Sequence, residues 1–89
     1  MFEWDENKRS INLVKHKLDF VAARLLFDGR PTICATSNNP DEMRHVTTGI
    51  LGDGKYYTVV WTWRDDARRI ISFRRARDVE ERAYREIYR

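Results

Sequence analysis

The spacing of apolar side chains divides the first thirty residues into one short strand and two helices. Residues 2–4 alternate in polarity, which fits a brief strand. Asp5 can cap a helix over residues 6–17, and Asp19 can cap a second, shorter helix that Gly29 ends. Each helix has an apolar stripe expected to face the core: Ile11, Val14 and Leu18 in the first, and Phe20, Ala23, Leu26 and Phe27 in the second.

The rest of the chain up to residue 76 is rich in β-branched and aromatic residues and predicts four strands. They cover residues 32–36, 45–51, 56–63 and 68–76. Turn-forming residues 52–55 link the second and third of these strands in a hairpin, and a turn around Asp65-Asp66 leads into the fourth. The run 56–63 alternates most clearly, with Tyr57, Val59, Trp61 and Trp63 on one face.

A third helix is expected at the end of the chain. Asp78 and Glu81 have the spacing of a capping box, and Val79, Ala83 and Ile87 form an apolar stripe. The order β-α-α-β-β-β-β-α predicts a single α+β domain over residues 1–89. We expect a small antiparallel sheet with two N-terminal helices and one C-terminal helix. Helices should cover one face of this sheet, leaving the other partly open for a ligand or partner.

Composition narrows the class of protein. Of the 89 residues, 42% are hydrophobic and 35% are charged, but three Trp, four Tyr and four Phe argue against a disordered chain. No apolar run approaches the ~18 residues of a membrane span, and no secretory signal is visible, so a cytoplasmic chain is the simplest expectation. Cys34 stands alone, which excludes an internal disulfide framework, and its apolar strand predicts a buried, inert thiol.

Positive charge is concentrated in the second half of the chain. Residues 1–44 are neutral overall, whereas residues 45–89 carry the whole net charge of +3, almost entirely through arginine. The guanidinium group suits bidentate binding of phosphate, so this half predicts a local nucleic-acid-binding patch. The alternative is a solvated surface in which arginines pair with carboxylates. The arginines concerned are Arg64, Arg68, Arg69, Arg74, Arg75, Arg77, Arg82, Arg85 and Arg89.

Motifs distributed along nearly the whole chain, from residue 2 to about residue 86, resemble one known family. They are Phe2, Trp4, Asp5, Lys8, Asn12, Lys15-His16, Phe20 and Phe27-Asp28, then Glu42, Arg44 and Gly49, then Arg69-Ile70-Ile71-Ser72 with Arg74-Arg75-Ala76, and finally Glu81, Arg82 and Tyr84. This pattern resembles the BrnT family of ribonuclease toxins from bacterial type II toxin–antitoxin pairs. Where the family usually has glycine after Lys-His, this chain has Lys17.

The resemblance implies a compact RelE/ParE-like fold and RNA cleavage that arrests translation. It also implies neutralisation by a BrnA-type antitoxin that carries the DNA-binding part, so that operator DNA would be contacted only through the antitoxin. We expect the antitoxin to cover part of the basic sheet face, because inhibition requires catalytic groups to be occluded or displaced.

RNA can be cleaved without metal when its own 2′-hydroxyl attacks the adjacent phosphate. Such a site needs a base, an acid and cations that stabilise the added charge. We expect neither a metal nor a cofactor, because the chain has no Cys/His ligand spacing and Asp65-Asp66 fits a turn better than a metal site. The candidate catalytic residues are His16, Arg64, Arg74, Glu81 and Tyr84. The candidate RNA-positioning residues are Lys15, Arg44, Arg69 and Arg75.

Each candidate also has a purely structural interpretation. His16 can interact with the dipole of the first helix, Arg74 can pair with Glu80 or Glu81, and Tyr84 can belong to the core. Strand alternation is expected to place Arg69 and Arg75 on one face, and Arg68 and Arg74 on the other, so the arginines cannot all serve one phosphate. Trp61 and Trp63 fit either the core or a base-stacking platform.

Two other functions need the same basic surface. One is a nucleic-acid-binding module without catalysis. The other is an inactive toxin that binds the antitoxin and modulates its repression.

Overall fold

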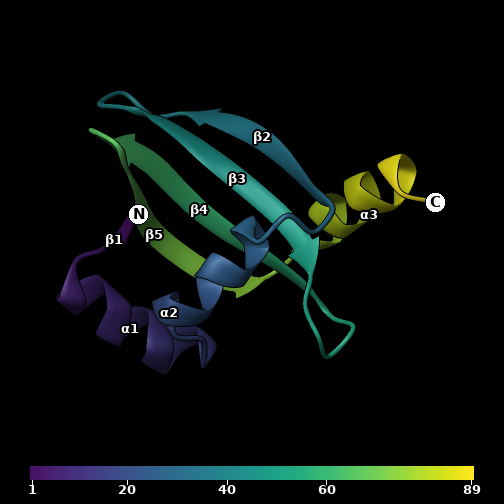
Figure 1. The fold of residues 1–89 in the computed structure, drawn as a ribbon, viewed down its shortest axis with the longest axis horizontal. Coiled ribbons are helices and arrows are strands. Elements are labelled where there is room, and N and C mark those ends of the chain that lie inside the picture. The colour runs from purple at the N-terminus through teal and green to yellow at the C-terminus, as the bar shows by residue number, and fades with distance from the viewer.

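The computed structural model describes residues 1–89 and contains a five-stranded sheet flanked by three helices (Figure 1). The predicted order of strands and helices is confirmed. Its elements are β1 (Phe2–Glu3), α1 (Glu6–His16), α2 (Phe20–Ala23), a 3₁₀ turn η1 (Arg24–Phe27), β2 (Thr32–Asn38), β3 (Met43–Ile50), β4 (Tyr56–Arg64), β5 (Ala67–Arg75) and α3 (Asp78–Ile87).

The sheet has the strand order β1-β5-β4-β3-β2 and is mixed rather than antiparallel throughout. Strands β2 to β5 form antiparallel hairpin-linked neighbours, whereas β1 pairs in parallel with the start of β5, Phe2 opposite Arg68 and Glu3 opposite Arg69. The expectation of an antiparallel sheet is therefore wrong at one edge. A two-residue strand is too short for its sequence to predict which strand it pairs with. Its parallel pairing with β5 follows from the way the N-terminus folds onto that strand.

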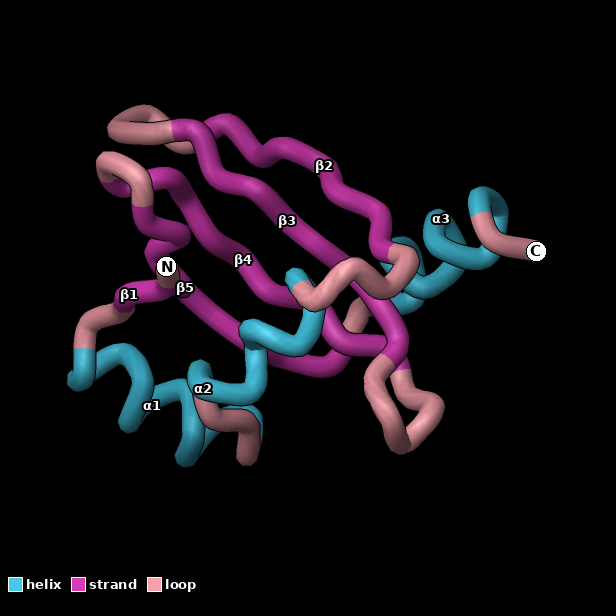
Figure 2. Tube along the Cα trace, viewed as in Figure 1, coloured by secondary structure: helices cyan, strands magenta, loops and turns pink.

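Helices lie on both faces of the sheet, where one covered face was expected (Figures 1 and 2). On one face, α2 and η1 bury Phe20, Ala23 and Leu26 against β4 and β5, and this face holds the hydrophobic core. On the other, α3 covers one end of the sheet, where the Thr58 hydroxyl donates to the Glu80 carboxylate at 3.0 Å. We call these the core face and the α3 face.

Helices α1 and α3 turn their predicted apolar stripes away from the protein. Ile11 and Val14 are 64% and 73% exposed, and Val79 and Ile87 are 66% and 67% exposed. The residues that face inward are polar or aromatic instead. They are Asn12 in α1, and Glu80 and Tyr84 in α3. Of the two expected stripes, only Leu18, which follows α1, packs against the core. The expected burial of the other stripe residues is wrong, because apolar spacing alone does not distinguish a stripe that meets the core from one that stays exposed.

The start of α3 lies one residue earlier than the capping-box spacing suggested. Arg77 is the N-cap, and its backbone N–H donates to the Glu80 carboxylate at 2.8 Å. Glu80 therefore fills the role expected of Glu81. Cys34, expected to be buried, is exposed because β2 is an edge strand.

Asn12 joins α1 to the edge of β5. Its side-chain amide donates to the Phe73 carbonyl at 2.8 Å and accepts from the Phe73 N–H at 3.1 Å, so it pairs with β5 as a neighbouring strand would. The same amide donates to the Leu18 carbonyl at 2.9 Å. These three bonds fix α1 along the part of β5 that β1 leaves uncovered.

Asn12→Ala is expected to lower the free energy of unfolding by about 2–3 kcal/mol. It leaves the buried N–H and C=O of Phe73 without partners, and unsatisfied buried groups cost about 1–3 kcal/mol each. Urea denaturation of the two proteins measures the difference. Asn7→Ala, at an exposed position on the same helix, is the control. Equal stability of Asn12→Ala and wild type would show that water or a shift of α1 replaces these bonds.

A β-bulge in β5 changes which arginines share a face. Val60 pairs with Ser72 and Trp61 pairs with Ile70, so Ile71 is an extra residue that reverses the alternation. Beyond it, Arg75 lies over the ring of Tyr57 on the core face, at 5.5 Å. Before it, Arg68 lies over Phe27 and Trp63 on the same face, at 4.7 Å and 5.0 Å.

The expected grouping of these arginines is therefore wrong. Arg68 and Arg75 share the core face, and Arg69 and Arg74 share the α3 face. An uninterrupted strand would have separated Arg69 from Arg74, and simple alternation assumes such a strand. The bulge thus brings two of the candidate site residues to one side of the sheet.

Candidate active site

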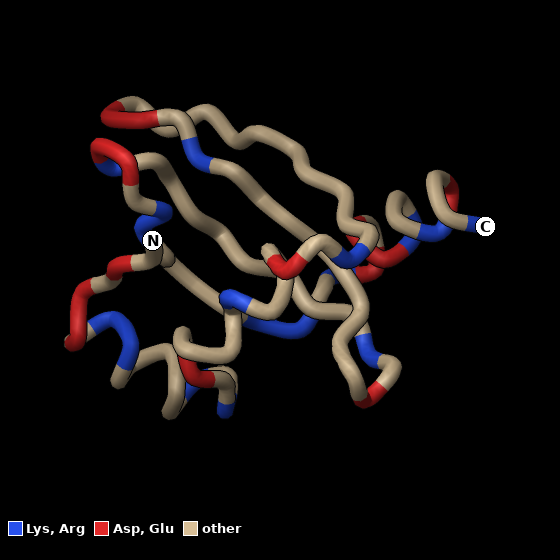
Figure 3. Tube along the Cα trace, in the orientation of Figure 1, with Lys and Arg blue, Asp and Glu red and all other residues tan.

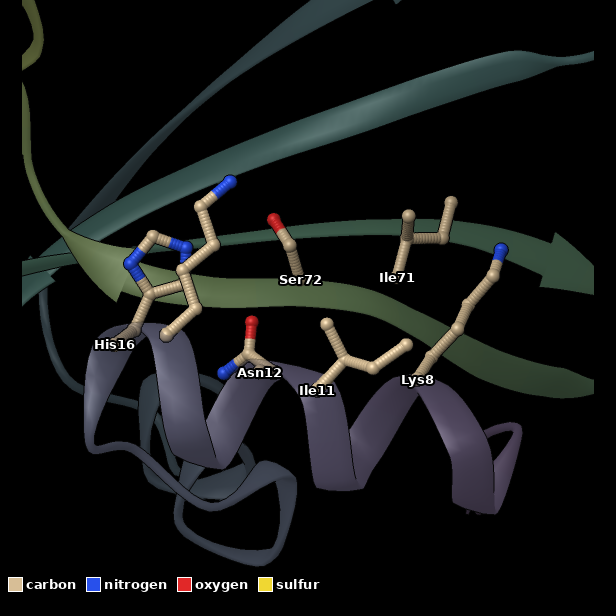
Figure 4. Close-up of a pocket in the computed structure, with 7 residues that line it drawn as sticks. Lys8, Ile11, Asn12, His16, Ile71 and Ser72 are labelled. Carbon is tan, nitrogen blue, oxygen red and sulfur yellow. The ribbon is translucent and has the colours of Figure 1, made fainter.

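A shallow cavity of about 250 Å³ lies between α1 and β5 (Figure 4). Side chains of α1 point from the helix toward the strand, and Ser72 faces them from β5. The strand presents Ser72 here because it follows the bulge at Ile71. The lining residues are Lys8, Ile11, Asn12, Lys15, His16, Ile71 and Ser72.

Lys8 and Lys15 are free cations at this cavity. Neither forms an ion pair with a carboxylate, and both are exposed. They are seven residues apart, which places them on the same side of α1 two turns from each other. The cavity is therefore flanked by two ammonium groups that are available to a phosphate.

His16 ends α1 and is half-buried at the same cavity. Burial lowers its pKa below the ordinary value, and the positive charges of Lys15 and Arg74 lower the pKa further. The imidazole is consequently neutral at pH 7 and can accept a proton. This state is the one that a general base requires.

Arg74 lies on the α3 face of β5, where Glu80 of α3 holds it. Its two terminal nitrogens donate to the two carboxylate oxygens of Glu80 at 2.7 Å and 2.9 Å, and both side chains are largely buried. Burial alone raises the pKa of Glu80, but hydrogen bonds from Arg74 and from the Arg77 N–H outweigh it and lower the pKa to about 2. The ion pair between Arg74 and Glu80, one of the two expected from the sequence, is thus present. Arg74 affects His16 only through its positive charge, which lowers the pKa of the imidazole.

Three other candidate arginines lie farther along the α3 face. Arg64 is exposed at the end of β4. Arg74 pairs with Thr58, six residues earlier on β4, so about 20 Å of strand separates Arg64 from the position of Arg74. Arg69 pairs with Glu3 at 2.8 Å, and Arg44 lies 3.6 Å from Glu42. Arg64 therefore does not join His16 in one site.

The remaining candidates lie away from the cavity. Glu81 pairs with Arg85 at 2.7 Å on the outer side of α3. Tyr84 is 6% exposed and packs against Tyr56 and Tyr88, with its hydroxyl 3.5 Å from the Pro31 carbonyl. Of the candidates, the structure brings His16 and Lys15 together at one cavity, with the charge of Arg74 close enough to act on His16.

Two groups at this site have no chemical role among the expectations from the sequence. Lys8 and Ser72 are motif positions there and nothing more, yet both line the cavity. A signal for Lys8 was present, because residues 8, 12, 15 and 16 follow helical spacing and define one polar side of α1. No comparable signal existed for Ser72, whose direction depends on the bulge.

Charge elsewhere on the protein is mixed. Figure 3 shows acidic and basic positions interleaved along α1 and α3. Ion pairs hold Arg69, Arg74, Arg85 and Arg89, so the arginine-rich half is in part the paired surface considered as an alternative.

No group of three or more His, Cys, Asp or Glu side chains is placed to hold a metal ion. None of the helices combines the length and apolar character that crossing a bilayer requires.

Comparisons with known proteins give one family. Residues 4–80 match the model of the ribonuclease toxin BrnT of type II toxin–antitoxin systems. Among solved structures, the 1.1 Å crystal structure of the Brucella abortus ribonuclease toxin BrnT is similar, with a TM-score of 0.63 and 24% sequence identity. The alignment covers 88% of this chain and 99% of that one, and at this identity it shows a shared fold. No curated protein matches.

Proposed function

Because the chain belongs to the BrnT family of ribonuclease toxins of type II toxin–antitoxin systems, we propose that it cleaves RNA without a metal ion, at the cavity between α1 and β5. The observation that carries this proposal is the placement of a half-buried His16, whose burial lowers its pKa, beside two unpaired lysines. Cleavage in the cytoplasm would arrest translation.

In the proposed reaction, His16 takes the proton of a ribose 2′-hydroxyl. The resulting oxygen attacks the adjacent phosphorus, and the bond to the 5′-oxygen of the next nucleotide breaks. The products are a cyclic phosphate and a 5′-hydroxyl, whose proton comes from solvent or from a protonated group. Lys8 and Lys15 stabilise the negative charge that accumulates on the phosphate, and Ser72 can donate a hydrogen bond to it.

The other candidate residues have supporting positions in this proposal. Burial and the charge of Lys15 lower the pKa of His16, and the charge of Arg74 lowers this pKa further. Arg44, Arg64 and Arg69 lie along the α3 face, where they can contact RNA beyond the cleaved bond, and Arg75 is available from the core face. Glu81 and Tyr84 stay candidates on the basis of resemblance alone, since neither lines the cavity.

A toxin of a type II system has an antitoxin protein as its partner. We propose that this partner is of the BrnA type, and that the chain reaches operator DNA only through it. The basic charge of the chain itself is mild, at +3, which favours a local RNA contact over general binding to DNA.

The decisive experiment is incubation of the purified chain, free of antitoxin, with naked RNA in excess EDTA. We expect the wild-type chain to cleave RNA, leaving cyclic phosphate ends. Lys8→Ala/Lys15→Ala, prepared in parallel, should cleave far more slowly and thereby excludes a contaminating nuclease. Intact RNA together with tight, salt-dependent binding would instead favour a non-catalytic binding module. Intact RNA without binding would favour an inactive toxin.

A further inference from the structure

The edge strand β2 lacks the usual protection against pairing with another chain. It is the last strand of the sheet, seven residues long, and Thr32–Asn38 includes no charged side chain and no proline. Sheet edges are normally shortened, charged, interrupted or covered, because their unpaired N–H and C=O groups bind other strands. Only the start of β2 is covered, by the Tyr88 hydroxyl that donates to the Thr32 carbonyl at 2.7 Å. Residues 33–38 therefore present an open backbone edge.

An apolar groove lies directly beside this edge, on the α3 face. Its volume is about 230 Å³, and most of its lining is aliphatic. Ile33 and Ala35 form the β2 side, Val46 the floor, and Val79 and Ala83 the α3 side. Val79 and Ala83, from the outward stripe of α3, thus line the groove beside β2.

The apolar lining and the absence of a free cation in the groove favour an apolar protein segment over RNA. Glu80 is its one charged residue, and Arg74 already neutralises it, so no free cation is available to the phosphates of RNA. Side chains on the opposite face of β2 are small and polar or weakly polar, as at Cys34 and Thr36. A segment that fits both surfaces is extended, with aliphatic side chains at alternate positions directed into the groove.

We propose that an extended segment of the antitoxin adds to β2 as a sixth strand and places its alternate aliphatic side chains in this groove. The proposal rests on the proposed function only in taking an antitoxin as the partner. The strand lies at the opposite edge of the four antiparallel strands from β5, about 14 Å away across the sheet, and His16 lies beyond β5 on α1. Strand addition anchors the antitoxin, and its remaining chain can then cover the α3 face.

The test compares two substitutions at adjacent, exposed positions of β2. Ala35→Glu places a charge in the groove, whereas Thr36→Glu places the same charge on the opposite face of the same strand. We expect Ala35→Glu to weaken binding of the purified cognate antitoxin by about 30-fold or more, as for a buried interface position, and Thr36→Glu by less than about 3-fold. Both variants should cleave RNA at the wild-type rate when free of antitoxin.

Hydrogen exchange supplies a second measurement on the unmodified complex. Backbone amides of residues 33–38 that point outward should exchange rapidly in the free chain and slowly in the complex. Unchanged exchange at these amides, or equal loss of binding in both variants, would overturn the proposal. So would a free chain that sediments as a dimer and becomes monomeric with Ala35→Glu, because the occupant would then be a second copy.

Failure of this proposal is distinguishable from failure of the proposed ribonuclease function. Protection of β2 in a complex whose free chain does not cleave RNA would contradict the ribonuclease proposal alone. RNA cleavage by the free chain, with β2 unprotected in the complex, would contradict strand addition alone.

Discussion

His16→Ala is expected to slow RNA cleavage by about 10²–10⁴-fold, the range typical of a lost general base. The protein should remain folded, since no protein group hydrogen-bonds the imidazole and the residue is the last of α1. Cleavage rates on a short RNA, measured with saturating substrate, test the expectation. The C-cap that follows α1 is Lys17, which adopts a left-handed conformation (φ 60°) and donates its backbone N–H to the Leu13 carbonyl, a bond that does not involve the His16 ring.

The pH dependence of cleavage gives an independent check on the role of His16. Burial and the charges of Lys15 and Arg74 hold its pKa below the ordinary value of about 6.5. A base must be unprotonated, so the rate should be level above about pH 6.5 and should fall as the pH drops through the lowered pKa of His16. A rate that falls with rising pH in this range would instead assign His16 as the acid.

His45 provides a matched control, because it is the one other histidine in the chain. It lies on the core face, where its ring stacks on Trp61 with a centroid separation of 4.6 Å. His45→Ala should retain cleavage within a few-fold of wild type. Comparable losses in both variants would indicate a general loss of structure, and wild-type cleavage by His16→Ala would remove His16 from the proposed mechanism.

Arg74→Ala is expected to lower the free energy of unfolding by about 3 kcal/mol, at the lower end of the range for a broken buried ion pair. The substitution leaves the Glu80 carboxylate, whose side chain is 16% exposed, without its bidentate partner. Glu80 also accepts from Thr58 and from the Arg77 N–H, so the loss reaches both β4 and the start of α3. Chemical denaturation at pH 7 measures the change.

The ion pair should also appear in the dependence of stability on pH. The pKa of Glu80 is about 2 in the folded protein, below its ordinary value of 4.5, so the folded state favours the ionised carboxylate. Its contribution is therefore fully present above about pH 4.5 and is lost as the pH falls toward 2. In Arg74→Ala, the free energy of unfolding should therefore fall much less than in wild type as the pH drops from about 4.5 toward 2. Parallel stability curves for wild type and variant between pH 5 and pH 2 would contradict the assignment.

A double substitution separates the structural role of Arg74 from its effect on His16. Arg74→Met/Glu80→Gln removes both charges while keeping an acceptor for the Arg77 N–H, and should recover most of the stability. Without the charge of Arg74, the pKa of His16 should rise, and the acid limb of the rate profile should move to higher pH. A stable double variant with an unchanged rate profile would show that Arg74 serves the fold alone.

Local sequence patterns determined where the helices and strands of this protein lie along the chain, but they determined little about which side of each one faces the core. Asp5 and Asp19 cap their helices through side-chain bonds to backbone N–H groups, as their positions before the helices predicted. The alternating run through Val59 became the central core strand. These features depend on neighbours within a few residues, which is why one sequence suffices to predict them.

The tertiary structure alone decided which side of each element meets the protein and hence where the candidate site lies. The bulge at Ile71 regrouped the arginines, and the two bonds between Asn12 and Phe73 turned the polar side of α1 toward β5. The pairing of Glu80 with Arg74 left the aliphatic stripe of α3 outside. Two of these choices pair buried polar groups, Asn12 with Phe73 from 61 residues away and Glu80 with Arg74 from six residues away. Only the tertiary structure decides that these groups are buried together, and their burial is what makes an unmade bond costly.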